Sequence, residues 1–210
     1  MLIALIGSTG RTGALVLDEL LLRGHRVRAL VRADGRITEG SSVTAVVGDC
    51  RDRVTLLTLV EGSDAVVSAL GPRGREGTLH RDTARALVTT MSAAGVHRFV
   101  GISGMAVAVP GDQRSPSAAV ATKIVRLVGG PLARDKREEY VVFAASELDW
   151  TLLRPPRLVD GEETANVEHG AHRSTRSSKI VRADLATCLV DLVEHGWYVR
   201  QAPLVATARR

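Results

Sequence analysis

Short apolar runs alternate with longer segments of helical period along most of the chain. The apolar runs have the length and β-branched content of buried strands and cover residues 2–6, 27–31, 43–47, 65–70, 97–102 and 150–153. The helical segments cover residues 12–22, 53–60, 78–94, 118–128, 132–145 and 184–196. This alternation is typical of βαβ units around a parallel sheet. It predicts one doubly wound, Rossmann-type α/β domain over residues 1–210, with residues 204–206 as a candidate last strand.

Two irregular stretches interrupt the alternation after predicted strands. Residues 104–116 form a loop long enough to be functional, and the polar run at residues 159–178, after Pro155 and Pro156, is expected to be the least structured part of the chain. Asp184 is expected to be the N-cap or a first-turn acid of the helix that follows. Sites in open parallel sheets lie at the carboxyl ends of the strands. We therefore expect loops 104–116 and 157–178 to form the walls of a substrate pocket.

The first predicted strand-to-helix turn has the sequence GSTGRTG, with glycines at Gly7, Gly10 and Gly13. Gly7 allows the sharp turn, Gly10 lets the backbone approach a pyrophosphate, and Gly13 lets the helix pack closely on the sheet. The helix N-terminus adds unpaired N–H groups and partial positive charge. An ordinary glycine-rich turn is the alternative, but the position between a strand and a helix favours a dinucleotide site. The residues expected to bind the cofactor here are Gly7, Ser8, Thr9, Gly10, Arg11, Thr12 and Gly13.

The end of the second predicted strand indicates which nicotinamide nucleotide binds. An acidic residue there binds the ribose 2′-OH of NAD, whereas an arginine meets the 2′-phosphate of NADP. Arg32 follows this strand, and Arg36 and Arg11 are able to join it, while Asp34 is the competing signal for NAD. We favour NADPH as the cofactor and keep NAD as a possibility; solvated loop charges are the alternative role for Arg32 and Arg36.

The charge balance narrows the class of ligand. The chain has 28 Lys and Arg residues against 23 Asp and Glu, a net charge of +5, and its lysines stand only at Lys123, Lys136 and Lys179. The arginines are scattered singly and aromatic residues make up 3% of the chain, so nucleic acid is not the expected partner. Arginine suits the phosphates of a small anionic ligand. We expect a small-molecule substrate and no nucleic-acid partner.

The remaining composition excludes several classes of protein. Cys50 and Cys188 are too few for a disulfide framework and lack metal-ligand spacing, and His169 and His172 are expected to be solvated loop residues, so no metal site is predicted. No run reaches the length of a membrane span, and the first apolar run has no basic segment before it. We expect a cytoplasmic protein without membrane contact, as a monomer or small homo-oligomer.

Five motifs together resemble the atypical short-chain dehydrogenase/reductases, and within them the NAD(P)H-binding, NmrA-like group with its flavin reductase and biliverdin-IXβ reductase branch. They are GSTGRTG, ALVR at residues 29–32, GDCRD at 48–52, the ISG segment that contains Ser103, and LRPP at 153–156. The resemblance spans nearly the whole chain and implies a Rossmann fold that binds NAD(P)H.

The resemblance also implies roles for residues near the strand ends. Ser103 matches the active-site serine of the superfamily. Asp49 would lie beside the adenine, and Pro155 near the nicotinamide. The residues implied to line the cofactor are Asp49, Cys50, Ala69, Leu70, Gly71, Ser103 and Pro155. The alternatives are that Asp49 caps the next helix and that the Ser103 hydroxyl makes a hydrogen bond to backbone at the end of its strand.

The catalytic helix departs from the family pattern. Typical members carry Tyr-x-x-x-Lys; Lys136 fits the lysine, but Leu132 stands at the tyrosine position and cannot donate a proton. Tyr140 lies one turn beyond Lys136 and is interpreted as a packing residue. Arg157 replaces the histidine of flavin reductase, and its permanent charge suits an acidic substrate. The expected catalytic residues are therefore Ser103, Lys136 and Arg157.

The missing tyrosine changes the expected reaction. Alcohol oxidation and sugar epimerisation need a base at the substrate hydroxyl, whereas hydride transfer to a flavin, quinone or similar planar conjugated acceptor needs only stacking and a weak acid. An NADPH-dependent reductase is the first hypothesis. The alternatives are a non-catalytic NADP sensor of the NmrA-like kind, and a ketone or enone reductase that uses Ser103 and Lys136 to polarise a carbonyl. An open apolar pocket favours an enzyme, whereas a blocked nicotinamide face beside a large exposed apolar patch favours a sensor.

Overall fold

A parallel sheet of six strands forms the centre of the molecule, in the order β3-β2-β1-β4-β5-β6. The computed structural model describes residues 1–32, 37–38, 40–72, 77–113, 120, 130–173 and 175–208. The strands are β1 (Leu2–Ile6), β2 (Arg26–Val31), β3 (Val43–Val47), β4 (Ala65–Ser68), β5 (Arg98–Ile102) and β6 (Asp149–Leu153). The order reverses between β1 and β4, as in the Rossmann fold. The predicted single-domain, doubly wound α/β fold is confirmed.

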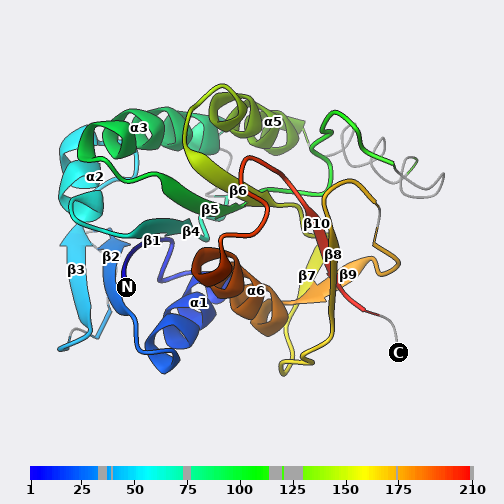
Figure 1. Cartoon of the computed structure of the whole chain (residues 1–210), viewed down its shortest axis with the longest axis horizontal. Coiled ribbons are helices and arrows are strands. Elements are labelled where there is room, and N and C mark those ends of the chain that lie inside the picture. Colours follow the sequence, from blue (N-terminus) through cyan, green and yellow to red (C-terminus); the bar gives the residue numbers. More distant parts are fainter. Residues whose placement is uncertain are drawn as a thin grey trace.

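Helices cover both faces of the sheet (Figure 1). One face carries α1 (Arg11–Leu22) and α6 (Arg182–His195), and the other carries α2 (Arg53–Val60), α3 (Leu79–Ala94) and α5 (Gly130–Ala144). None of the helices in the described part of the chain is long and apolar enough to cross a membrane. The helix predicted at 118–128 lies outside the described residues, except for residue 120, which is helical.

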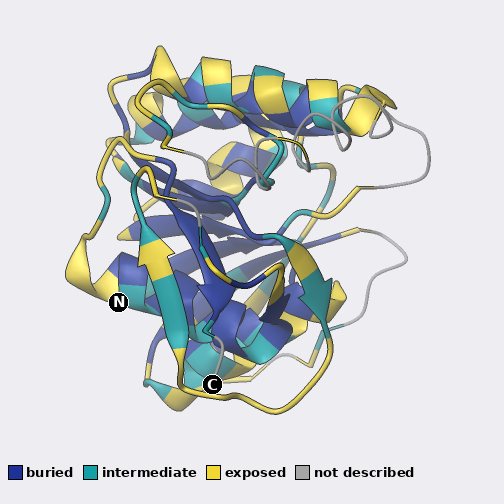
Figure 2. Ribbon diagram, turned by 90° about the vertical axis from the view of Figure 1, so that its right-hand side faces the viewer, coloured by how far each residue is buried: buried dark blue, intermediate teal, exposed yellow. Residues whose placement is uncertain are grey.

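The two-sided cover explains why the strands read as continuous apolar runs. Successive side chains of a strand point to opposite faces, so Leu5 packs in the cluster with α1 and α6, whereas Ile6 packs in the cluster with α2 and α3. Both residues are almost fully buried, and Figure 2 shows the central strands as the most buried part of the molecule. Strands covered on both sides therefore favour apolar residues at most positions.

Helix ends follow the local chemistry of the chain. Asp52 caps α2, because its carboxylate accepts the N–H of Thr55 at 2.9 Å. The helices α3 and α6 stop at Gly95 and Gly196, whose φ angles of +68° and +64° are left-handed and favour glycine. Both helices therefore end at a glycine, which adopts the left-handed backbone of the turn without strain.

The polar run at residues 159–178, expected to be the least structured part of the chain, contains the short strand β8 (Val167–Gly170). Two further strands that were not predicted flank it, β7 (Arg157–Val159) and β9 (Lys179–Val181). β7 pairs with β9 in parallel, and β8 pairs antiparallel with β10 (Leu204–Thr207), the predicted last strand. These strands are short and partly polar, so their pairing depends on distant partners rather than on a local pattern.

The structure shows the second of the two roles expected of Asp184. Helix α6 begins at Arg182 after the N-cap Val181, so Asp184 is a first-turn acid and not the cap. Its buried carboxylate accepts hydrogen bonds from the N–H and hydroxyl of Thr164 and from the hydroxyl of Thr207. Asp184 thereby ties the loop before β8 and the last strand to α6.

Candidate functional site

The turn between β1 and α1 brings backbone against backbone. Gly7 has a φ of +84°, and a Cβ added to it would lie 2.8 Å from the carbonyl carbon of Ala69. A Cβ on Gly13 would lie 1.9 Å from the carbonyl oxygen of Gly7. The N-cap of α1 is Gly10, which has no side chain with which to cap the first N–H groups of the helix. These groups suit an anion such as a pyrophosphate.

Two polar side chains of this turn point away from the adjoining pockets. Ser8 is buried, and its hydroxyl donates to the carbonyl oxygen of Leu30 at 3.3 Å. Arg11 is exposed and faces Asp160 across 3.5 Å. Neither residue lines a pocket described below. The sequence analysis predicts that Arg11 can join Arg32, but the structure does not bring the two side chains together.

A first pocket of about 260 Å³ opens at the ends of β1, β2 and β4. It brings together nine of the predicted cofactor residues: Gly7, Thr9, Gly10, Arg32, Asp49, Cys50, Ala69, Leu70 and Gly71. Arg36 and the competing Asp34 lie outside the described residues. The pocket joins a glycine cradle to an arginine and apolar walls, which are the groups that the adenosine half of a dinucleotide requires.

Asp49 and Cys50 form one wall of this first pocket. Asp49 accepts hydrogen bonds from the backbone and guanidinium of Arg51 at 2.8–2.9 Å. The alternative that Asp49 caps the next helix is wrong, because Asp52 does so. The hydroxyl of Thr83 lies 3.2 Å from the Cys50 sulfur, and burial raises the pKa of the Cys50 thiol. Cys50 thus presents a neutral thiol to the pocket.

A second pocket of about 450 Å³ adjoins the first, and Ala69, Leu70, Gly71 and Pro72 line both. It lies at the carboxyl ends of β4, β5 and β6, against α5 and β7. It brings together the predicted residues Thr12, Ser103, Lys136, Pro155 and Arg157. Most of its remaining wall is apolar and includes Ile102, Met105, Ala106, Val107, Leu132 and Leu158.

Only parts of the two expected loops line this second pocket. The first loop contributes residues 104–107, and the second contributes Arg157 and Leu158. His169 lies elsewhere, in β8, where its Nδ1 is 2.7 Å from the hydroxyl of Tyr198. The wall is therefore built close to the strand ends rather than along the whole of either loop.

Ser103 stands at the end of β5 on the wall of the second pocket. Its backbone N–H donates to the carbonyl oxygen of Leu153 at 2.7 Å. Its side chain is 7% exposed, and within the described part of the chain the hydroxyl has no hydrogen-bond partner. The alternative that this hydroxyl makes a hydrogen bond to backbone at the end of its strand is therefore wrong. A buried hydroxyl without a partner costs free energy, which a ligand in the pocket would recover.

Lys136 reaches the same pocket from α5 and is 9% exposed. Its Nζ donates to the carbonyl oxygen of Ile102 at 2.6 Å and lies 3.1 Å from Oε2 of Glu139. Burial lowers the pKa of Lys136 and raises the pKa of Glu139, since both charges are held away from water. The lysine is thus anchored between a strand carbonyl and a carboxylate of its own helix.

Leu132, which occupies the tyrosine position of the family pattern, presents an apolar side chain to the pocket. Leu132 lines the pocket together with Lys136 one turn later. Tyr140 instead packs edge-on against Trp150, with 5.9 Å between the ring centroids, beside the core cluster that contains Phe143. The interpretation of Tyr140 as a packing residue is confirmed.

Sequence reasoning missed a buried aspartate that connects α5 to α3. Asp135 accepts hydrogen bonds from the backbone N–H groups of His80 and Arg81, both at 2.9 Å, and so caps α3 in place of Thr78, which makes no side-chain cap. Its Oδ2 also lies 2.9 Å from Nδ1 of His80, and Nε2 of that ring lies 3.3 Å from the carbonyl oxygen of Leu70. Burial and the charge of Lys136 lower the pKa of His80 to about 4, so the ring is neutral near pH 7.

Arg154 of the LRPP motif is a second residue whose role sequence reasoning missed. Its guanidinium is fully buried and contacts both carboxylate oxygens of Asp112 at 2.7 Å. It also donates to the carbonyl oxygens of Val107 at 2.9 Å and Ala202 at 2.6 Å. Arg154 therefore ties the pocket loop to β6 and to the C-terminal segment. A charged residue at the end of an apolar run was the available signal.

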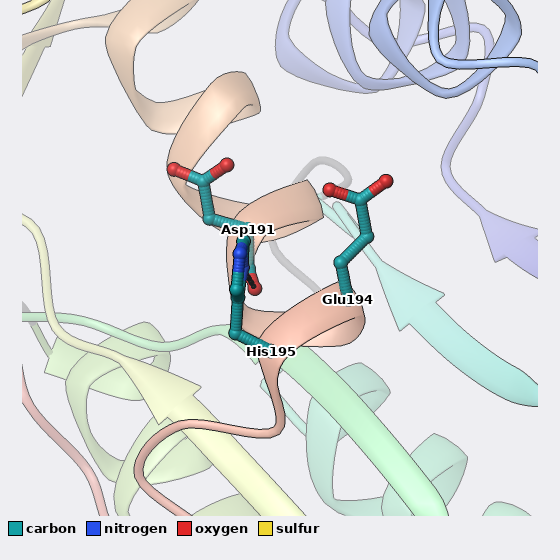
Figure 3. A group of neighbouring side chains, drawn as sticks. All are labelled: Asp191, Glu194 and His195. Atoms are coloured by element: carbon teal, nitrogen blue, oxygen red, sulfur yellow. Dashed lines mark hydrogen bonds between the residues drawn. The ribbon is translucent and has the colours of Figure 1, made fainter.

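Three possible metal ligands, Asp191, Glu194 and His195, gather near the end of α6 (Figure 3). Nη1 of Arg23 lies 2.7 Å from Asp191 and 2.6 Å from Glu194, so a guanidinium already balances the two carboxylates. None of the three residues lines the two pockets described above. The geometry favours an ion-pair cluster that fastens α6 to the end of α1.

Comparison with known proteins gives relatives that match almost the whole chain. YwnB of Bacillus subtilis is 28% identical over 215 residues, 93% of each chain. The crystal structure of a candidate exported protein from Burkholderia pseudomallei is 32% identical, with a TM-score of 0.81 over 98% of this chain and 99% of that one. A candidate NADH-flavin reductase from Streptococcus pneumoniae is 24% identical, with a TM-score of 0.79 over 99% of both chains, and shows the same fold.

The family comparison agrees with the geometry of the two pockets. The match begins at Gly7, the first residue of the glycine turn, and continues through both pockets into α6. Because the model of the NAD(P)H-binding family matches residues 7–196, the chain belongs to that family of Rossmann-fold proteins.

Proposed function

We propose that this protein is an NADPH-dependent reductase that delivers hydride to a planar conjugated acceptor such as a flavin or quinone. The observation that carries the proposal is the apolar pocket of about 450 Å³ that continues from the dinucleotide pocket across residues 69–72. A flat apolar acceptor fits such walls, and stacking on the nicotinamide orients it for transfer.

The chain supplies the groups that would hold the dinucleotide. The tight turn at Gly7 and Gly13 has no room for side chains, and the N-terminus of α1 would bind the pyrophosphate. Arg32, at the end of β2, would meet a 2′-phosphate. When bound, the reduced nicotinamide supplies the hydride.

The residues of the second pocket would then bind the acceptor and balance its charge. Met105, Val107 and Leu158 exclude water from the reacting atoms. The Ser103 hydroxyl and the Lys136 ammonium offer donors to an oxygen or nitrogen that gains negative charge. Arg157, exposed on the same wall, suits an acidic substituent.

The test is a set of NADPH oxidation assays with flavins, quinones, tetrapyrroles and ketones as acceptors. We expect turnover with a flavin or a quinone. Tight nucleotide binding without turnover of any acceptor would contradict the reductase and indicate a sensor. Stereospecific reduction of a ketone alone would instead support a carbonyl reductase that uses Ser103 and Lys136, which line one pocket.

Replacing Arg32 with alanine tests the choice of nucleotide. A charge-assisted hydrogen bond contributes about 1.5–3 kcal/mol, so the affinity for NADPH is expected to fall about tenfold to a hundredfold. The affinity for NADH is expected to stay nearly constant, because NADH lacks the 2′-phosphate. Titration of nucleotide fluorescence measures both affinities. Arg26→Ala, at the opposite end of β2, is the control; equal losses for both nucleotides in Arg32→Ala contradict the assignment.

A further inference from the structure

Glu139 of α5 is buried, but it does not cap a neighbouring helix as the buried Asp135 does. Asp135 on the same helix caps α3 through the N–H groups of His80 and Arg81. Glu139 is 6% exposed, and the hydrogen bonds described for its carboxylate are those with Nζ of Lys136, at 3.1 and 3.4 Å. Carboxylates are rarely buried in this way unless a cation compensates them. The role of Glu139 therefore lies in what it does to Lys136.

The lysine side chain has one donor more than these contacts use. An ammonium group carries three N–H bonds. One donates to the carbonyl oxygen of Ile102 at 2.6 Å, and one is directed to Glu139 when its two oxygens share that N–H. The third N–H remains for a ligand in the pocket that Lys136 lines with Ser103.

We propose that Glu139 is a positioning residue that keeps Lys136 protonated and fixes its ammonium group as the proton donor of the substrate pocket. The proposal rests on the proposed reductase function and assigns the weak acid which that reaction needs. It also explains how a chain with leucine at the tyrosine position retains an acid beside the acceptor.

The proton balance of the step is simple. The hydride carries two electrons and one hydrogen from the reduced nicotinamide to the acceptor, which becomes an anion. The N–H bond of Lys136 breaks, its proton forms a new bond to the charged oxygen or nitrogen of the acceptor, and the amine remains neutral. Water then returns a proton to Nζ. Glu139 keeps its charge throughout. Its charge opposes release of the Lys136 proton to any base weaker than the charged acceptor.

The surrounding charges act on Lys136 in opposite directions. Burial lowers its pKa, while Glu139 and, less strongly, Asp135 raise it from the same helix. On α3, His80 is the facing titratable group, and it is neutral near pH 7 because its pKa is about 4. Among the described residues, Arg157 is the other cation that lines the pocket. Removing the Glu139 charge leaves burial less opposed, so Lys136 would lose its proton at a lower pH.

The small number of lysines makes this proposal directly measurable. The chain contains only Lys123, Lys136 and Lys179, so isotope-labelled lysine gives three side-chain resonances by NMR. Lys123→Arg and Lys179→Arg assign them by elimination. Following the Nζ resonance of Lys136 through a pH titration gives its pKa in the full-length protein without nucleotide or acceptor.

Glu139→Gln is the test variant. Since a carboxylate at hydrogen-bond distance typically shifts a neighbouring pKa by about 1–3 pH units, we expect the Lys136 pKa to fall by that amount. Glu139→Asp is expected to restore part of the loss. The matched control is Glu138→Gln on the same helix, because Glu138 pairs with Arg81 and Arg134 at the surface and not with Lys136.

Two results would overturn the proposal. One is a Lys136 pKa that is the same in Glu139→Gln as in the wild type. The other is a wild-type Lys136 that is uncharged at neutral pH, which needs no variant and so decides the question even if Glu139→Gln does not fold.

The activity readout separates this proposal from the reductase function. With NADPH and menadione as the probe pair, kcat is expected to fall as the pH rises through the pKa of Lys136, because only the ammonium donates. Glu139→Gln should move this fall to lower pH by the shift seen in the NMR titration, with the KM for NADPH unchanged. Absence of turnover with any acceptor contradicts the reductase, whereas the nucleotide-free titration decides the role of Glu139.

Discussion

Replacing Arg154 with methionine is expected to lower the free energy of unfolding by about 3–5 kcal/mol. The guanidinium is fully buried and pairs with both oxygens of Asp112 at 2.7 Å. Methionine would remove the two hydrogen bonds that the Asp112 carboxylate accepts from the guanidinium, and the carbonyl oxygens of Val107 and Ala202 would each lose a donor. Breaking one side of a buried pair is costly because the remaining charge is uncompensated.

Denaturant unfolding of the two proteins measures this difference. Arg134→Met is the control, because Arg134 is 82% exposed and its surface pair with Glu138 should contribute little to stability. The double variant Arg154→Met with Asp112→Leu is expected to recover part of the loss, since it removes both charges. An effect of Arg154→Met no larger than that of the control would show that the pair does not hold the loop.

The same substitution is also expected to affect the substrate pocket. Val107 lines the pocket and is bonded to Arg154 through its carbonyl oxygen. A loop released from this contact would hold the acceptor less well, so KM for the acceptor should rise more than KM for NADPH. The buried arginine thus connects stability to the geometry of the site.

Replacing Gly7 with alanine is expected to weaken NADPH binding by about a hundredfold or more, which corresponds to about 3 kcal/mol. Two separate effects act at this position. The φ of +84° strains any residue with a Cβ, and that Cβ would lie 2.8 Å from the backbone of Ala69. Because the clash is with backbone, relief requires the β4 end and the glycine turn to move apart. Ala69 lines both pockets, so this movement would alter both.

Isothermal titration with NADPH measures the loss of affinity. Gly40→Ala is the matched control, since a Cβ there would meet nothing within 4 Å and the residue does not need a left-handed backbone. A near-normal affinity in Gly7→Ala would contradict the assignment of the turn as the pyrophosphate cradle. A thermal unfolding curve in the absence of nucleotide separates loss of binding from loss of the fold.

The sheet and most of its helices were predictable because their signals are local. Strands buried on both faces are apolar at nearly every position, so β1 and β4 are visible as short runs in the sequence. The strands β7, β8 and β9 were not predictable, because they are partly polar and depend on partners elsewhere in the chain. Pairing across such separations leaves no local pattern.

The candidate site likewise has residues that were predictable from the sequence and side-chain directions that were not. The glycine turn and the strand ends indicated Gly7, Arg32 and Ser103 as pocket residues, and the structure places each on a pocket wall. Arg11 carries the same kind of charge as Arg32, yet its side chain faces Asp160 instead. Sequence spacing places a residue on an element but does not decide where its side chain points.

The sequence by itself determined the α/β alternation, the glycine turn and the absence of a tyrosine one turn before Lys136, because each depends on residues close together in the chain. Only the tertiary structure decided which charges are buried and with which partners. Arg154 meets Asp112, and Lys136 lies between Glu139 and Ile102. Burial and compensation of charge arise when several elements close around one volume, and that closure is a property of the folded chain.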